Sequence, residues 1–138
     1  WTEMTSVFSF IDLPDEAQLQ LDAYLAAVDA SSAVARTGNT YDDISNANDK
    51  AISDMGLKVA GKHTPDCHST GLDGSDGPSS ASDPDFVLKS NMILSYHPGT
   101  VLENDKGFLI TDNFMVTDEG AVRLSPHNAD RYYIRLEK

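Results

Sequence analysis

Two neighbouring segments with helical spacing constrain the fold of this chain more than any other feature. In residues 15–36 the apolar positions recur every three or four residues, and Pro14 with the two acids after it is typical of a helix start. Gly38 follows as a natural helix end. Residues 41–55 repeat the spacing behind Thr40, which has an Asp three positions later, as in a capping box. The short connection between the two segments predicts an αα-hairpin.

The rest of the chain has the texture of β structure. A strand-like run lies in the first ten residues, and residues 61–85 are rich in Gly, Ser, Asp, Pro and His, which predicts a long loop. Further strand-like runs are found at residues 86–88, 91–96, 107–117, 121–124 and 132–136. Helices that precede a series of strands indicate an α+β fold, with the helices on one face of a mostly antiparallel sheet. The length of 138 residues favours a single domain.

The charge of the chain excludes several classes of partner. Lys and Arg number 10 and Asp and Glu number 22, for a net charge of −12. Such acidity argues against binding to nucleic acid or to anionic membrane surfaces, because both require basic patches. No apolar run is long enough to cross a bilayer, and no signal peptide is visible. The one cysteine, Cys67, excludes an internal disulfide, and a cytoplasmic protein is expected.

Four segments in order along the chain resemble motifs of the pita-bread hydrolases, which include methionine aminopeptidases, Xaa-Pro aminopeptidases, prolidases and creatinase. Residues 37–44 are similar to the turn between the two helices of that family. Residues 68–76 (HSTGLDGSD) resemble its H-x-x-G-L-D-x-H-D segment. Residues 91–99 (NMILSYHPG) are similar to G-M-v-x-t-x-E-P-G, and residues 107–120 (GFLITDNFMVTDEG) to G-v-r-I-E-D-x-x-x-V-T-x-x-G.

This resemblance implies a fold and a place within a larger domain. Residues 1–138 are expected to form the C-terminal half of a pita-bread catalytic domain, an αα-hairpin packed on a curved, mainly antiparallel sheet. The active site of the family lies between two such halves. The chain is therefore expected to pair with an N-terminal segment that it lacks, or with a second copy as a dimer.

The resemblance also locates the positions of the metal ligands. Metal-dependent members hold two divalent ions with two Asp, one His and two Glu. The second Asp position corresponds to Glu3, the His to His68, the first Glu to His97 and the second Glu to Thr111, while the first Asp would precede Trp1. A neutral hydroxyl cannot replace the charge of a bridging carboxylate. We therefore predict that the dinuclear site is absent, and no cofactor is expected.

The function implied is hydrolysis of a C–N bond in a small peptide, amide or amidine without the metal pair. His68 is the predicted acid–base residue, His97 the assisting residue and His63 a substrate-binding residue. Ser75 stands where the family has a further catalytic His. Cys67, next to His68, is expected to be a small buried thiol rather than a nucleophile.

Two alternatives remain open from the sequence. A single divalent transition metal held by His63, His68 and His97 is one, although their spacing matches no dedicated motif. The other is a catalytically degenerate relative that serves as a binding or interaction module.

Overall fold

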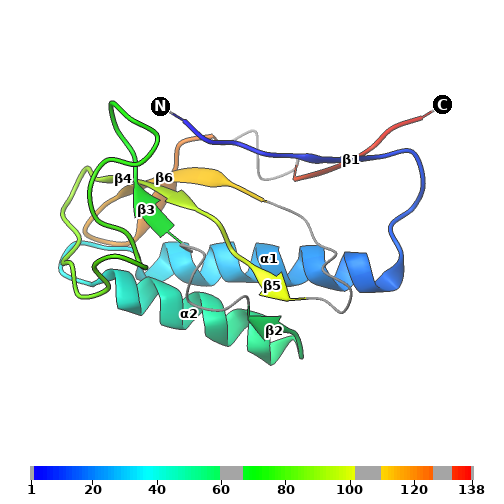
Figure 1. Ribbon diagram of the computed structural model, residues 1–138, viewed down its shortest axis with the longest axis horizontal. Coiled ribbons are helices and arrows are strands. Elements are labelled where there is room, and N and C mark those ends of the chain that lie inside the picture. The colour runs from blue at the N-terminus through cyan, green and yellow to red at the C-terminus, as the bar shows by residue number, and fades with distance from the viewer. Residues whose placement is uncertain (1, 60–66, 102–109, 126–131, 138) are drawn as a thin grey trace.

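Two antiparallel helices pack beneath a sheet in this protein, as Figure 1 shows for the computed structural model. The structure describes residues 2–59, 67–101, 110–125 and 132–137. The helices are α1 (Asp15–Val34) and α2 (Tyr41–Asp54). The strands are β1 (Val7–Ser9), β2 (Lys58–Val59), β3 (Cys67–Ser69), β4 (Ile93–Tyr96), β5 (Thr100–Val101), β6 (Asp112–Val116), β7 (Ala121–Arg123) and β8 (Tyr133–Arg135).

The two helices form where the apolar spacing predicts them. α1 begins directly after Pro14, and it ends at Val34, two residues before the predicted end. The capping box of α2 is confirmed: the Thr40 side chain accepts from the backbone N–H of Asp43, and the Asp43 carboxylate accepts from the backbone N–H of Thr40. The start of α2 is therefore specified by local sequence.

The main sheet has four strands in the order β3-β4-β6-β7, and every neighbouring pair is antiparallel. The strands β2 and β5 form a short antiparallel pair, and β1 pairs with β8 in parallel. This arrangement of two helices on a mainly antiparallel sheet confirms the α+β prediction.

One strand prediction and one loop prediction differ from the structure. Residues 86–88 form no strand. Val87 makes one isolated bridge with Thr40, and the apolar side chain of Leu88 is buried in the core without belonging to a strand. Conversely, β3 lies inside the segment predicted to be a loop. β3 is only three residues long and its residues have little strand propensity, so it forms because β4 supplies the hydrogen-bonding partners.

The core between the helices and the sheet fixes which way β3 faces. It joins fully buried residues of α1 and α2 to residues of β3, β4 and β6. Cys67 lies within this core and has no exposed surface, as predicted. Since successive side chains of a strand alternate between its faces, His68 points away from the core. On that side it contacts Glu3 of the N-terminal segment, and this segment passes over β6 (Figure 1).

Neither of the described helices is both long enough and apolar enough to cross a membrane.

Candidate functional site

Four polar side chains meet at one end of the main sheet. Nε2 of His68 lies 2.9 Å from Nε2 of His97. The Oε2 atom of Glu3 lies 3.1 Å from Nε2 of His97 and 3.7 Å from Nε2 of His68. The hydroxyl of Thr111 lies 3.2 Å from Nδ1 of His97. These side chains come from residues that are up to 108 positions apart in the sequence, from 3 to 111.

Strand register explains how the two histidines come together. His68 in β3 is paired with Ser95 in β4, so His97 lies two residues further along the neighbouring strand and on the same face. The imidazole rings stack with their centroids 5.0 Å apart and an interplanar angle of 15°. Tyr96 is paired with Asp112, and the next residues outward are His97 and Thr111. The antiparallel register thus sets the site directly.

The second nitrogen of each imidazole has a partner within the protein. Nδ1 of His68 lies 3.0 Å from the backbone carbonyl of Ser69. Since a carbonyl only accepts hydrogen bonds, this contact places a proton on Nδ1 and leaves Nε2 of neutral His68 as an acceptor, facing Nε2 of His97. Nδ1 of His97 faces the hydroxyl of Thr111, which can donate or accept. Nε2 of His97 faces two acceptors, the lone pair on Nε2 of His68 and the Glu3 carboxylate, so neutral His97 carries its proton on Nε2 and its Nδ1 accepts from the Thr111 hydroxyl.

Electrostatics favour the neutral form of His97. Burial lowers the pKa of its imidazole below the usual value, and the neighbouring His68 lowers it further, while the Glu3 carboxylate opposes both effects. The net direction is downward because the partly exposed carboxylate only partly offsets the cost of burying a charge. At neutral pH the His97 ring is thus an uncharged donor and acceptor.

The backbone of Glu3 is held in place by Asn113 in β6. The amide nitrogen of Asn113 donates to the Glu3 carbonyl at 2.5 Å and to the Thr2 hydroxyl at 3.0 Å. Its amide oxygen accepts from the Ser95 hydroxyl at 2.9 Å, and both Ser95 and Asn113 are buried. A further tie joins the N-terminal segment to β6, because the Thr5 hydroxyl accepts from the backbone N–H of Thr111 at 2.7 Å. Asn113 is therefore a positioning residue for the Glu3 carboxylate.

We predict that Asn113→Ala lowers the free energy of unfolding by about 1–3 kcal/mol, the usual cost of leaving buried polar groups without partners. The loss arises because the Ser95 hydroxyl and the Glu3 carbonyl both lose their hydrogen bonds. Urea-induced unfolding measures the change. Asn46→Ala is the matched control, since Asn46 is exposed on α2 and bonds only the neighbouring Asp42, and its loss should cost less than about 0.5 kcal/mol. Equal costs for the two variants would contradict the positioning role.

Both carboxylate oxygens of Asp112, which follows Thr111, have partners within the fold. Its Oδ2 atom accepts from the Tyr132 hydroxyl at 2.5 Å and lies 2.8 Å from Nε of Arg123, an ion-pair contact. Its Oδ1 atom accepts from the backbone N–H of Asn113. Burial and the hydrogen bond to Asp112 raise the pKa of Tyr132, so this phenol stays protonated and donates. The carboxylate of Asp112 is therefore not available to the histidine centre.

The structure brings most of the predicted site residues together. His68, His97 and Glu3 are in mutual contact and Thr111 contacts His97, whereas His63 lies outside the described residues. The expected loop position of His68 is wrong: His68 belongs to β3 and is only 7% exposed, because pairing with β4 orders this segment. Sequence reasoning missed Asn113 and Ser95, and only their register as a cross-strand pair could have indicated them.

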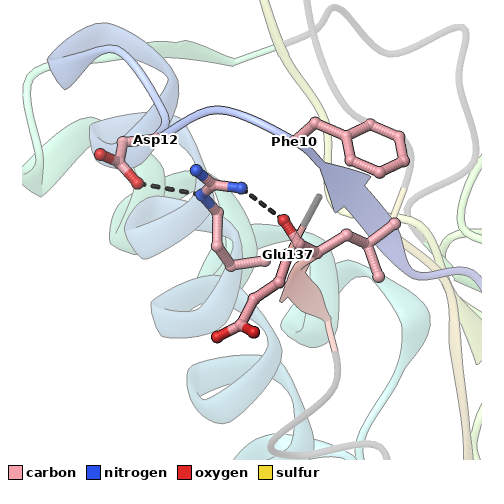
Figure 2. Close-up of a pocket in the computed structure, with 5 residues that line it drawn as sticks. Phe10, Asp12 and Glu137 are labelled. Atoms are coloured by element: carbon pink, nitrogen blue, oxygen red, sulfur yellow. Dashed lines mark hydrogen bonds and ion pairs between the residues drawn. The ribbon is translucent and has the colours of Figure 1, made fainter.

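An open hollow lies elsewhere, beside the β1–β8 pair, and contains no histidine. Figure 2 shows its lining side chains, Phe10, Asp12, Arg135, Leu136 and Glu137. Nε of Arg135 lies 3.0 Å from the Asp12 carboxylate, and Nη1 donates to the Leu136 carbonyl at 2.6 Å. Since its one cation is already occupied by these partners, the hollow offers less chemistry than the histidine centre does.

Comparison with known proteins gives a consistent family result. The sequence profile of metallopeptidase family M24 matches residues 1–118. An uncharacterized hydrolase/peptidase, y4tL, from Sinorhizobium fredii is 29% identical over 100 residues, which are 72% of this chain and 25% of that protein.

Solved structures share the fold over nearly the whole chain. The X-Pro aminopeptidase from Thermotoga maritima superposes with a TM-score of 0.81 at 22% identity, covering 95% of this chain and 37% of that one. A dipeptidase from Pyrococcus horikoshii gives 0.82 at 22% identity, covering 98% and 37%. The Xaa-Pro dipeptidase from Bacillus anthracis gives 0.80 at 20% identity, covering 95% and 37%. The present chain thus spans about a third of the length of these solved relatives.

Proposed function

The chain belongs to metallopeptidase family M24, and from that premise we propose that it hydrolyses a C–N bond at the centre formed by Glu3, His68 and His97, without a bridged pair of metal ions. The observation that carries this proposal is the convergence of two imidazoles and a carboxylate within 3.7 Å of one another. Such a group combines a proton acceptor, a proton donor and a compensating charge, which are the requirements of acid–base hydrolysis.

The donor set of the centre does not fit a bridged pair of cations. The positions that resemble the family's two Glu ligands are occupied by His97 and Thr111, and neither side chain offers a carboxylate. Asp112 does not compensate, since Tyr132 and Arg123 hold its buried carboxylate. With Glu3 as the one carboxylate of the centre, two divalent ions about 3.5–4 Å apart would be poorly neutralised and would repel each other strongly. This mismatch supports a reaction that runs on the side chains alone.

His68 is the proposed general base. The lone pair on its Nε2 accepts a proton from the attacking water, and the nearby Glu3 carboxylate stabilises the imidazolium that results. The water oxygen bonds to the substrate carbon, the C–N bond breaks, and His68 returns the proton to the departing nitrogen. His97 assists as a neutral donor whose orientation is fixed by the Thr111 hydroxyl.

Short peptides with proline in the second position are the first substrates to test, because the solved relatives include an X-Pro aminopeptidase and an Xaa-Pro dipeptidase. Simple amides and amidines are the further candidates. The test is an assay of the whole protein with matched sets of Xaa-Pro dipeptides, amides and amidines, with product detected by mass spectrometry. Turnover of one set supports the proposal, and no turnover of any set by well-folded protein would contradict it.

A second candidate is a binding module that has lost catalysis. The neutral Thr111 in a position of a charged ligand favours this alternative, because it removes the strongest electrostatic group of the site. The same peptides distinguish the two functions: a binding module retains them unchanged, with saturable binding by calorimetry, whereas the hydrolase releases products.

Association and location remain predictions. The β1 region carries exposed apolar side chains, with Phe8 59% and Phe10 56% exposed. Large exposed apolar groups of this kind typically mark a surface that another element covers. We expect an N-terminal segment outside this chain, or a second copy, to pack there, and we expect the protein to work in the cytoplasm.

A further inference from the structure

We propose that Glu3, His68 and His97 bind one divalent transition-metal ion of the Zn²⁺ or Co²⁺ class, at a site whose ligands differ from the carboxylate-rich set expected for the family. This inference concerns binding alone and stands whether or not the protein hydrolyses a C–N bond. Among the described residues, these three form the one group of potential metal ligands whose donor atoms come within 4.8 Å of one another.

The spacing of the three donor atoms matches a single small ion. Zinc–nitrogen and zinc–oxygen bonds of about 2.0–2.1 Å in a tetrahedral arrangement place the ligand atoms roughly 3.3 Å apart. The observed separations are 2.9 Å between the two Nε2 atoms, 3.1 Å from His97 to Glu3 and 3.7 Å from His68 to Glu3. Since these values lie on both sides of the ideal, shifts of a few tenths of an ångström would complete the geometry.

Both imidazoles already have the support that metal-binding histidines require. A ligating His typically donates its other ring N–H to an oxygen, which fixes the tautomer and the ring orientation. Nδ1 of His68 has the Ser69 carbonyl as that oxygen. When an ion occupies Nε2 of His97, the proton of that ring moves to Nδ1, where the Thr111 hydroxyl can accept it. The Glu3 backbone is anchored by Asn113. Each of the three ligands is therefore supported by a hydrogen-bonding partner outside the site, and both Nε2 atoms lie near the Oε2 atom of Glu3.

The chemistry of the donors selects the class and the number of ions. Imidazoles suit zinc, cobalt and copper, whereas magnesium and calcium prefer oxygen ligands. Two His and one carboxylate leave a fourth position open, a ligand set typical of single-ion zinc sites. A second ion would require further carboxylates, because Glu3 already serves the first ion and neither His97 nor Thr111 adds another. We therefore expect one equivalent per chain.

Ion binding competes with the proposed acid–base role of His68. Both use the lone pair on Nε2 of His68, the atom that would accept a proton from water. One equivalent of Zn²⁺ should therefore suppress hydrolysis by the ion-free protein. The suppression follows from the geometry and needs no change of fold.

Calorimetric titration of the chelator-stripped whole protein with ZnCl₂, and separately with CoCl₂, tests the proposal. The expected result is one equivalent bound, with the visible absorption of four-coordinate Co²⁺. Glu3→Gln and His97→Gln should each weaken binding by 10²-fold or more, and Thr111→Val by about 10-fold through loss of the Nδ1 partner. Glu119→Gln, an exposed carboxylate in the β6–β7 turn, is the matched control and should leave the affinity unchanged.

Three results would overturn the proposal: no saturable heat, two equivalents bound, or an unchanged affinity in both His97→Gln and Glu3→Gln. Melting curves of each variant without metal show whether it is folded, so that a lost heat is not mistaken for unfolding. The metal titration and the hydrolysis assay test the two proposals independently. Binding without turnover removes the proposed reaction alone, and turnover without binding removes the metal site alone.

Discussion

His68→Gln should lower the rate of C–N hydrolysis by about 10²-fold or more, the usual loss when a general acid–base residue is removed. Glutamine retains much of the volume of the imidazole and its hydrogen-bonding capacity, but it cannot carry the proton between water and the leaving nitrogen. Initial rates of the whole protein on a cleaved peptide measure the effect. The expected fall is in kcat, because the reacting proton rather than substrate binding is affected.

Stability must be measured alongside, because His68 is a buried strand residue that contacts His97. His68→Ala should give the same loss of rate and a lower melting temperature as well, since it also leaves a cavity. If the specific activity of the folded fraction stays intact in both variants, His68 is a structural residue and not the general base.

Asp112→Ala should destabilise the protein by about 3 kcal/mol, the largest effect on stability that we predict. The substitution leaves the largely buried Arg123 without its carboxylate and the Tyr132 hydroxyl without its acceptor. It also removes the acceptor for the backbone N–H of Asn113. Urea-induced unfolding gives the free energy.

Asp118→Ala provides the comparison, because Asp118 is an exposed acid in the turn after β6. That variant should change the free energy of unfolding by less than about 0.5 kcal/mol. A loss below about 1 kcal/mol for Asp112→Ala would mean that the buried ion pair hardly exceeds the cost of its own desolvation.

The helices were predictable because their determinants are local. The Thr40–Asp43 capping box and the apolar spacing within residues 41–55 act over a few neighbouring residues, so the sequence alone indicates α2. β3 was not predictable, because Cys67–Ser69 has no strand character of its own and depends on a partner 25–29 residues further along, at 94–96. Pairing between distant segments has no local signature.

The candidate site was likewise predictable only in part. The segments around His68 and His97 resemble family motifs, so both residues were identified before the fold was known. Their contact, and the arrival of Glu3 from the start of the chain, follow from sheet register and from the bonds of Asn113. Such bonds leave no pattern in a single sequence, which is why the hydrogen bond from Asn113 to the Glu3 backbone was found only in the structure.

The rate of peptide hydrolysis before and after exhaustive chelation, with the metal content measured in parallel, tests most directly whether Glu3, His68 and His97 work without a metal pair. We predict that the rate persists or rises as metal is removed, and that it falls when one equivalent of Zn²⁺ is returned. A rate that disappears with the metal and is restored only by two equivalents of a divalent ion would contradict this.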